Sequence, residues 1–333
     1  MKEALYYKKL KNRIVLCQLC PKFCTLKPTQ IGDCKARKNI NGKLKSLVYG
    51  NPISIAIDPI EKKPLFHFLP GTRALSIGTT GCNLHCKFCQ NWGTSQSNIE
   101  DCGSKTISPK EVIKESIKNN CKIIAYTYNE PTIFYEYVLE IAKLAKKAGI
   151  KNIIVSNGYI NQEPLKEWCK YLDAANIDLK SFTEKFYKEL TTAKLKPVLE
   201  TIKTLYQQGV WLEITNLLIP KYNDKQKEIG EMCKWISKNT TKNTPIHFSR
   251  FFPYYKLLNM PPTPLKTLVK AQKIAQKYLN HVYIGNVQTI KGENTYCQNC
   301  NKLLIERKGY SIIQNNIREG KCNCNKIIKG VWK

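Results

Sequence analysis

Short runs of apolar and β-branched residues alternate with longer segments of helical period through the middle of the chain, from Ala74 to about Val287. The strand-like runs lie at 74–80, 122–128, 152–157, 174–180, 211–219 and 245–252, and the helical segments at 109–120, 133–148, 164–172, 194–208, 224–239 and 264–280. The clearest helix, 133–148, has one continuous apolar face and is followed by Gly149, a typical stop residue. Six βα units with right-handed crossovers predict a parallel sheet, either doubly wound or curled into a partial barrel.

Shorter elements are predicted on both sides of this series. Residues 1–43 place turn-forming Pro and Gly among cysteines, and 45–58 predicts one or two strands. The stretch LLIERKGYSIIQ (303–314) alternates like a small β-hairpin. We therefore expect an N-terminal segment with lead-in strands (1–60), an α/β region (61–290) and a small C-terminal module (291–333).

Composition excludes several classes of protein. The chain has 333 residues, of which 42% are apolar and 10% aromatic, enough to build a large core, so global disorder is excluded. The N-terminal stretch MKEALYYKKLKNRIVL lacks the apolar core and small-residue cleavage site of a secretory signal. No apolar run reaches the ~18 residues that a membrane span needs. We expect a cytoplasmic protein that does not interact with a membrane.

The charge is strongly positive. The sequence has 54 Lys and Arg against 25 Asp and Glu, a formal net charge of +29. Such an excess is typical of proteins that bind nucleic acid, which makes RNA a candidate partner. However, Arg, which contacts phosphates and bases through its planar fork, supplies only six of the 54. An AT-rich genome that fills surface positions with Lys explains the same composition.

Cysteine is the most informative residue type. Fifteen cysteines in a chain without an export signal do not form a disulfide framework, because the cytosol keeps thiols reduced. Eleven of them fall into three tight groups, whereas Cys102, Cys121, Cys169 and Cys233 stand alone. Grouped thiols in a cytosolic protein indicate ligands for soft metals.

The central group lies in GCNLHCKFCQNW (81–92), directly after the first strand of the βα series. Cys82, Cys86 and Cys89 have the spacing Cys-x3-Cys-x2-Cys and supply three thiolates for a cubane cluster. No fourth cysteine is near in sequence, so the fourth iron would be open to a substrate or cofactor. The alternative is a zinc site with one distant ligand, which would not account for the position at the end of a barrel strand.

This triad, with Phe88 before its last cysteine, resembles the signature of the radical S-adenosylmethionine (SAM) superfamily. The resemblance implies a partial (β/α)6 TIM-like barrel, a [4Fe–4S] cluster and SAM as cofactors, and reductive cleavage of SAM. In that family the cleavage gives methionine and a 5′-deoxyadenosyl radical, which abstracts hydrogen from a substrate. The protein itself supplies orientation and a dry cavity.

The resemblance also assigns residues to SAM at the ends of successive strands. Besides Phe88, these are Asn129 and Glu130 after the second strand, Ser156 and Asn157 after the third, and Asp178 and Lys180 after the fourth. The Glu130 carboxylate matches the SAM ammonium group, and the alternative is a negative charge at the start of helix 133–148.

The order of elements is similar to that of the pyruvate formate-lyase activating enzymes, with three departures. These are Tyr-Asn-Glu-Pro at 128–131 in place of Gly-Gly-Glu-Pro, Val155 in place of an acidic residue, and Tyr255 in place of a histidine. A fuller resemblance, carried by CQLCPKFCTL, IDPIEKKPLFHFLPGT, AYTYNEPTIFYEY and HFSRFFPYYKL, is to the AmmeMemoRadiSam-system radical SAM proteins. It implies as partners the other two protein types of that system, beside a one-electron donor of flavodoxin or ferredoxin type.

The terminal groups each contain four cysteines. Cys297, Cys300, Cys322 and Cys324 flank the predicted hairpin and suit a zinc ribbon, with an iron–sulfur cluster as the alternative. The hairpin is too small to bury much core, so metal would supply much of its folding energy. Cys17, Cys20, Cys24 and Cys34 suit either zinc or an auxiliary [4Fe–4S] cluster.

Three functions are consistent with these patterns. The first is a radical SAM enzyme, similar to the activating enzymes of glycyl-radical proteins, that abstracts hydrogen from a protein or peptide. The second retains the chemistry but acts on RNA, which the basic charge favours. The third is a non-enzymatic metal-ribbon scaffold or binding protein, which would assemble a cluster without cleaving SAM.

Overall fold

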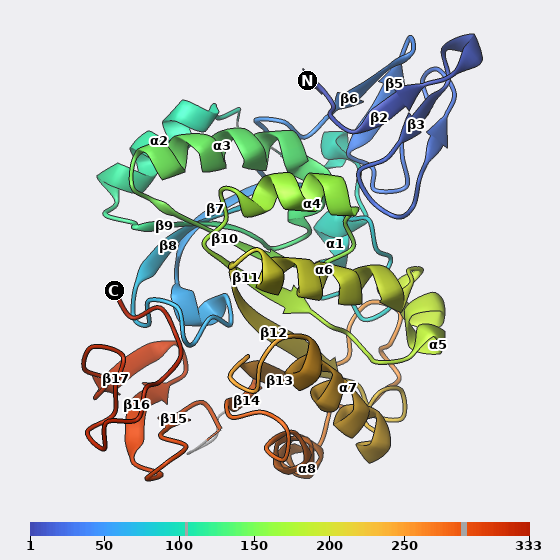
Figure 1. Ribbon diagram of the computed structural model, residues 1–333. Coiled ribbons are helices and arrows are strands. Elements are labelled where there is room, and N and C mark those ends of the chain that lie inside the picture. The colour runs from blue at the N-terminus through green and yellow to red at the C-terminus, as the bar shows by residue number, and fades with distance from the viewer. Residues whose placement is uncertain (104–105, 288–291) are drawn as a thin grey trace.

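The computed structural model describes residues 1–103, 106–287 and 292–333, and an eight-stranded sheet forms its centre (Figure 1). In order across the sheet, the strands are β14 (Val282–Gly285), β13 (Ile246–Arg250), β12 (Trp211–Leu218), β11 (Ala174–Asp178), β10 (Lys151–Ser156), β9 (Ile123–Tyr126), β8 (Arg73–Gly78) and β7 (Ser54–Pro59). Strands β8 to β14 are parallel, and β7 pairs antiparallel with β8 at one edge. Because neighbours in the sheet are also neighbours in sequence, the sheet winds in one direction, as in a barrel. The predicted partial barrel is confirmed.

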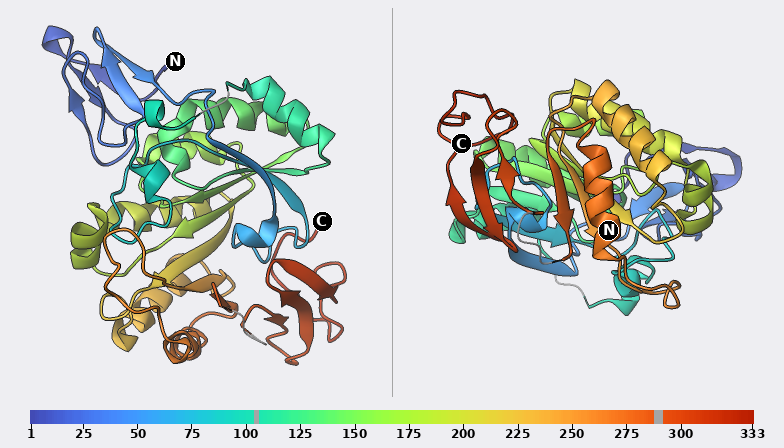
Figure 2. Two further views of the ribbon diagram at one scale, coloured as in Figure 1. Left: turned by 180° about the vertical axis from the view of Figure 1, so that it is seen from behind. Right: turned by 90° about the horizontal axis from the view of Figure 1, so that it is seen from below.

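The long helices cover one face of this sheet, which Figure 2 shows from behind and from below. They are α2 (Pro109–Lys118), α3 (Tyr135–Lys147), α4 (Gln162–Cys169), α6 (Leu195–Gln207), α7 (Gln226–Asn239) and α8 (Leu265–Ala275). Helix α2 begins at a capping box in which Ser108 and Glu111 each accept a backbone N–H of the other. The chain leaves α3 through Gly149, whose φ of 71° ends the helix without steric cost. All six predicted helices are present.

Shorter helical turns occupy loops at the carboxyl ends of the strands. They are α1 (Trp92–Ser95), η3 (Ile99–Asp101), η4 (Pro131–Phe134), α5 (Glu184–Phe186) and the π-helical η5 (Tyr187–Thr191), whereas η1 (Lys11–Arg13) and η2 (Ile60–Lys62) lie before the barrel. Residues 133 and 134, predicted as the start of a helix, belong to the 3-10 turn η4, because Pro131 opens a tight turn there.

Small antiparallel sheets form both ends of the chain. The N-terminal segment holds β1 (Lys2–Glu3), β2 (Tyr7–Lys9), β3 (Val15–Cys17), β4 (Thr25–Leu26), β5 (Arg37–Ile40) and β6 (Lys43–Ser46), and the C-terminal module holds β15 (Thr295–Tyr296), β16 (Leu303–Lys308) and β17 (Ser311–Asn315). The hairpin predicted at 303–314 is the β16–β17 pair. The two N-terminal sheets, β1–β6–β5 and β2–β3–β4, lie at the opposite corner of the molecule from the C-terminal sheet (Figures 1 and 2).

Two apolar cores hold the barrel together. The larger lies between the sheet and the helices. A smaller one packs Leu65 and Phe68, from the connector before β8, against Ile123 and Ile153 of the sheet. Phe68 also forms a bridge with Val331, so the C-terminal tail seals the amino ends of the strands. In the described part of the chain, no helix is long and apolar enough to cross a membrane.

Candidate functional site

The loop between β8 and α1 carries Cys82, Cys86 and Cys89 at the carboxyl end of the first parallel strand. Backbone N–H groups of His85 and Lys87 donate to the carbonyls of Thr191 and Leu190 at 3.0 and 2.9 Å, which fastens the loop to the π-helical turn. Cys86 is buried, whereas Cys82 and Cys89 are half-buried. Burial raises the pKa of the Cys86 thiol to about 12, so its proton would leave only as a metal cation binds.

The three cysteines line one cavity of about 230 Å³. Residues of β11 to β13 and of the loops that follow the parallel strands supply its wall. The wall consists of Cys82, Leu84, Cys86, Phe88, Cys89, Gln90, Asn91, Ser95, Tyr128, Asn129, Asn157, Asp178, Lys180, Thr215, Leu217, Ser249 and Asn286. The cavity therefore occupies the carboxyl edge of the sheet, where parallel barrels place their active sites. Eight residues predicted for the cluster or SAM meet here.

Asn129 and Asn157 present amides to the cavity from two adjacent loops. The Asn157 side chain donates to the Cys82 Sγ at 3.7 Å and to the Asn83 Oδ1 at 2.9 Å. The Asn129 amide donates to the Thr79 carbonyl at 2.7 Å, and its Oδ1 accepts from the Thr94 hydroxyl at 3.2 Å. These bonds fix both amides beside the cysteine loop before any ligand binds.

Asp178 and Lys180 form an ion pair at the end of β11, with 3.0 Å between the Lys180 Nζ and the Asp178 Oδ2. Burial alone would lower the pKa of Lys180, but the Asp178 carboxylate and the Cys86 thiol raise it further than burial lowers it. The ammonium group also lies 5.8 Å from the centre of the Phe88 ring. The pair therefore offers a fixed cation and a partly exposed carboxylate to a zwitterionic ligand such as SAM.

Glu130 and Ser156, which the resemblance assigns to SAM, are not among the residues that line the cavity. Both are buried behind its wall. The Glu130 carboxylate accepts four hydrogen bonds, from the Thr132 N–H and hydroxyl, the Ser156 hydroxyl and the Asn157 N–H, at 2.6–2.9 Å. It caps the turn η4, as the alternative interpretation of Glu130 expected, and joins the loops after β9 and β10. These two side chains position Asn157.

The substitution Glu130→Gln tests this positioning role. The amide nitrogen of the new side chain would replace either Oε2 and face the Asn157 N–H, or Oε1 and face the other three donors. Each lost charge-assisted bond is worth about 1.5–3 kcal/mol. We expect a lower free energy of unfolding and at least fivefold weaker binding of SAM, measured by denaturation and by equilibrium dialysis. Glu163→Gln, at an exposed position of α4, is the matched control. If Glu130→Gln had the same stability and the same affinity for SAM as the wild type and the control, the role of Glu130 in positioning Asn157 would be refuted.

Several wall residues were not predicted from the sequence. Asn91 and Ser95 belong to the turn after the triad, and the Ser95 hydroxyl lies 3.4 Å from the Cys89 Sγ. Thr215 lies in the second half of β12, a predicted strand on which Glu213 and Asn216, but not Thr215, were candidates to line the cavity. Asn286 follows β14, a strand that was not predicted. Only the rule that carboxyl-end residues face the site would have indicated them.

The C-terminal quartet is already arranged as a metal site. Among the described residues, Cys297, Cys300, Cys322 and Cys324 form the one group of three or more Cys, His, Asp or Glu whose ligand atoms all lie within 4.8 Å of one another. The Sγ atoms of Cys297 and Cys324 are 3.6 Å apart, as are those of Cys300 and Cys322. This quartet can hold a metal ion. The N-terminal quartet, by contrast, surrounds a separate pocket.

Comparisons with known proteins agree with this geometry. A family model described as the radical SAM superfamily matches residues 76–235. The protein MJ0808 of Methanocaldococcus jannaschii, whose function is uncharacterised, is 46% identical over 92% of both chains. The same organism's putative glycyl-radical enzyme activating enzyme MJ1632 is 28% identical, over 62% of this chain and 79% of its own. The pyruvate formate-lyase-activating enzyme of Clostridium pasteurianum is 24% identical, over 56% and 77%.

Among solved structures, the crystal structure of Streptococcus suis SuiB bound to precursor peptide SuiA matches with a TM-score of 0.52. The sequence identity is 16%, and the match covers 69% of this chain and 52% of that one, so it supports the fold alone. The family match begins within β8, includes the triad and β9 to β12, and ends before β13 and β14. The chain belongs to the radical SAM superfamily and is a radical SAM enzyme related to the activating enzymes of glycyl-radical enzymes.

Proposed function

We propose that this radical SAM enzyme abstracts hydrogen from a protein or peptide substrate. The observation that carries the proposal is a second cavity, of about 380 Å³, which shares Ser249 and Asn286 with the triad cavity. It continues along β13 and β14 to Phe66 and to Tyr310 of the C-terminal module. The two cavities together would give one substrate segment contact with both the triad loop and the C-terminal module.

The relatives favour the same class of substrate. MJ1632 and the Clostridium protein are both named as activating enzymes, which act on another protein. The sheet is not closed between β14 and β7, and the second cavity lies beside β14. The superfamily assignment disfavours the non-enzymatic scaffold. RNA remains a second candidate, favoured by the net charge of +29.

When bound, a [4Fe–4S] cluster and SAM supply one electron and a 5′-deoxyadenosyl radical for hydrogen abstraction. The chain's own residues would hold and shield these groups. Cys82, Cys86 and Cys89 would bind three irons, and Lys180 and Asp178 would pair with the carboxylate and ammonium groups of SAM. Phe88 is only 4% exposed and would shield the thiols of Cys82, Cys86 and Cys89 from water.

The substitution Lys180→Ala tests the SAM site separately from the cluster. Replacement of Lys180 by alanine removes the cation that pairs with Asp178. We therefore expect the affinity for SAM to fall at least tenfold, while the iron content stays within a fifth of the wild-type value. SAM binding is measured by its perturbation of the reduced-cluster EPR signal. Lys188→Ala, at an exposed position nearby, should behave as wild type. Unchanged affinity in Lys180→Ala would contradict the assignment.

Transfer of deuterium from the substrate to 5′-deoxyadenosine identifies the class of substrate. Extract from cells grown in D₂O is separated into protein and RNA fractions, and each is incubated with reduced enzyme and unlabelled SAM. Deuterium in 5′-deoxyadenosine is then measured by mass spectrometry. The proposal expects labelling from the protein fraction that protease treatment removes and nuclease treatment does not. Labelling from RNA alone would refute it and favour the RNA candidate.

We further propose the other two protein types of the AmmeMemoRadiSam system as the first partners to test. The proposal rests on the sequence resemblance, which extends from the N-terminal cysteines to the segment around His247. A purified partner that is the substrate should raise 5′-deoxyadenosine formation and donate deuterium to it. A partner that does neither is excluded as a substrate.

We also propose zinc for the C-terminal quartet. With Zn–S bonds of about 2.3 Å, a tetrahedral site separates its sulfur atoms by about 3.8 Å, close to the two 3.6 Å pairs. The module's core is small and consists mainly of these cysteines and a few aliphatic residues. Metal binding would therefore supply much of its stability.

The substitution Cys300→Ser is expected to remove one zinc per chain and to unfold residues 294–333. Mass spectrometry of the native protein gives the metal content, and hydrogen exchange reports the unfolding. Exchange should also rise at Phe66 and His67, because Arg307 donates to the Phe66 carbonyl at 2.8 Å and the His67 ring bonds the Lys329 carbonyl at 2.8 Å. Retained zinc with unchanged exchange would contradict the assignment.

A further inference from the structure

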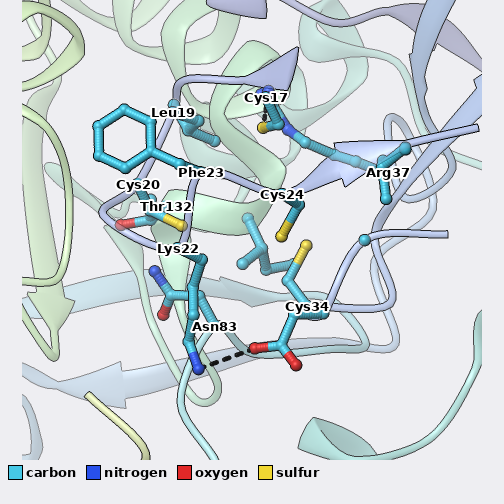
Figure 3. Close-up of a pocket in the computed structure, with 14 residues that line it drawn as sticks. Cys17, Leu19, Cys20, Lys22, Phe23, Cys24, Cys34, Arg37, Asn83 and Thr132 are labelled. Carbon is cyan, nitrogen blue, oxygen red and sulfur yellow. Dashed lines mark hydrogen bonds and ion pairs between the residues drawn. The ribbon is translucent and has the colours of Figure 1, made fainter. Parts of the chain in front are cut away.

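The N-terminal quartet forms a second thiol-lined site beside the triad loop (Figure 3). Cys17 ends β3, Cys20 and Cys24 lie in the turn before β4, and Cys34 precedes β5. All four line one small pocket whose other walls are largely apolar, with Leu19, Phe23, Leu26 and Ile133 among them. Four thiols facing one apolar pocket are the donor set of a soft metal centre.

The spacing of the sulfur atoms separates this site from the zinc-like one. Among the described residues, the sulfur atoms of the C-terminal quartet all lie within 4.8 Å of one another, whereas neither the N-terminal quartet nor the triad forms a comparably close group. A single zinc draws its four thiolates close together, whereas the four irons of a cubane hold them apart. By this measure the N-terminal quartet resembles the triad and differs from the C-terminal quartet.

The surroundings of the quartet also suit a cluster. The Arg37 guanidinium pairs with Glu136 on α3 through Nη2, and its Nη1 lies 3.6 Å from the Cys17 Sγ, so the cation lies between the carboxylate and the thiols. Four thiolates around a [4Fe–4S]²⁺ core carry net negative charge, and a buried cation offsets the cost of burying it. Arg37 is 1% exposed, so its charge is little screened by water.

Three contacts join this pocket to the triad loop, and each involves a neighbour of a triad cysteine. Asn83, next to Cys82, lines the N-terminal pocket. The ring of His85, next to Cys86, forms an ion pair with Asp33 at 2.9 Å. At Gly81 an added Cβ would meet the Cys34 carbonyl oxygen at 2.4 Å, so only glycine permits this approach. The two sites are therefore packed directly against each other.

We propose that Cys17, Cys20, Cys24 and Cys34 hold a second [4Fe–4S] cluster that passes electrons to the triad cluster. A one-electron donor of flavodoxin or ferredoxin type would be oxidised as the second cluster goes from the 2+ to the 1+ state. That cluster would return to 2+ as the triad cluster is reduced by the same electron. The electron relay rests on the proposed function, because it serves SAM cleavage. The proposal that the N-terminal quartet holds a [4Fe–4S] cluster is independent of that function.

The surface of the N-terminal segment is suited to such a donor. Residues 1–43 contain eleven Lys and Arg but only two acidic residues. Lys8, Lys9, Lys11, Arg13 and Lys27 are exposed, and Phe23 at the edge of the pocket is 49% exposed. A donor with an acidic face would dock here by charge complementarity, close to the quartet.

Metal analysis of the full chain tests the cluster. Four proteins are reconstituted without oxygen in iron, sulfide and equimolar zinc. They are the wild type, the triad variant Cys82→Ala/Cys86→Ala/Cys89→Ala, the quartet variant Cys20→Ser/Cys24→Ser, and Cys102→Ser as control. Two cubanes predict about eight irons per chain in wild type and control, and about four in each of the other two. The cluster left in the triad variant should give an EPR signal that SAM does not change. The cluster left in Cys20→Ser/Cys24→Ser should respond to SAM.

If the triad variant contains zinc but no iron while the wild type contains iron, the proposal is overturned and the N-terminal quartet is a zinc site. If the triad variant fails to fold, the loss of about four irons from Cys20→Ser/Cys24→Ser decides the same question, because an unchanged iron content overturns the proposal.

The relay has its own readout. The ratio of SAM cleavage driven by reduced flavodoxin to cleavage driven by dithionite is compared between wild type and Cys20→Ser/Cys24→Ser. We expect the ratio to fall at least tenfold, because dithionite reaches the triad cluster without the relay. An unchanged ratio would overturn the relay. Absence of cleavage with either reductant in wild type would instead count against the proposed function, which the metal analysis does not depend on.

Discussion

Replacement of Cys86 by alanine is expected to abolish SAM cleavage, with 5′-deoxyadenosine formation at least a thousandfold below wild type. Cys86 is the most buried of the three triad thiols, and neither remaining cysteine can take its place at the cavity wall. A cubane held by two thiolates is poorly retained, and without it no electron reaches SAM. Product is quantified by mass spectrometry after anaerobic reconstitution and reduction.

Two controls separate loss of the cluster from loss of the fold. Cys102→Ala replaces a lone, half-buried cysteine outside the three groups and should retain full activity. The thermal midpoint of metal-free Cys86→Ala should match that of metal-free wild type, because the substitution removes little apolar volume. Product formation by Cys86→Ala at more than a tenth of the wild-type rate would disprove the role of the triad.

Replacement of Arg37 by methionine is expected to detach the N-terminal segment from the barrel. Arg37 on β5 forms an ion pair with Glu136 on α3, and each side chain is only 2% exposed. Glu136 also accepts from the Leu5 N–H at 2.8 Å, and the Arg37 Nη1 donates to the Leu5 carbonyl at 2.9 Å. Loss of one partner from a buried pair costs about 3–5 kcal/mol, because the other charge remains buried and unpaired.

Hydrogen exchange at residues 1–46 measures this effect, as a decrease in the free energy of opening. Arg37→Met/Glu136→Gln should recover part of the loss, because it removes both charges. Lys45→Met breaks an exposed pair with Glu3 at 3.3 Å and should cost less than about 1 kcal/mol. Equal exchange in Arg37→Met and Lys45→Met would show that the buried pair does not anchor the segment.

The features that the sequence predicts well are local. Short apolar runs identify six strands, and apolar positions repeated every three to four residues identify six helices. Each pattern is local because it reflects how one element faces the core. The triad is equally local, since its three ligands lie within eight residues of chain. The hairpin at 303–314 is confirmed for the same reason.

The features that the sequence does not reveal depend on packing between distant segments. Strand β14 was not predicted, and its place in the sheet is set by pairing with β13. Strand β7 precedes the predicted boundary at residue 60 and yet pairs with β8 along six residues. The sequence does not reveal that the Glu130 carboxylate accepts hydrogen bonds from Ser156 and Asn157, at and after the end of β10.

The position of the N-terminal cysteines is likewise a tertiary property. Their spacing fits zinc or a cluster equally well, and nothing in it indicates that Cys34 packs against Gly81 of the triad loop. That contact depends on the left-handed backbone of Gly81, at φ 97°, and on the ion pair between Asp33 and His85.

The most direct test of the central claim is the stoichiometry of SAM cleavage by the reduced wild-type protein. The chain is reconstituted anaerobically with iron and sulfide, reduced with dithionite and mixed with SAM, and the products are quantified together. Reductive cleavage at the triad cavity predicts 5′-deoxyadenosine and methionine in equal amounts, formed only while the EPR signal of the reduced cluster is present. Intact SAM beside a fully reduced, EPR-visible cluster would contradict the account.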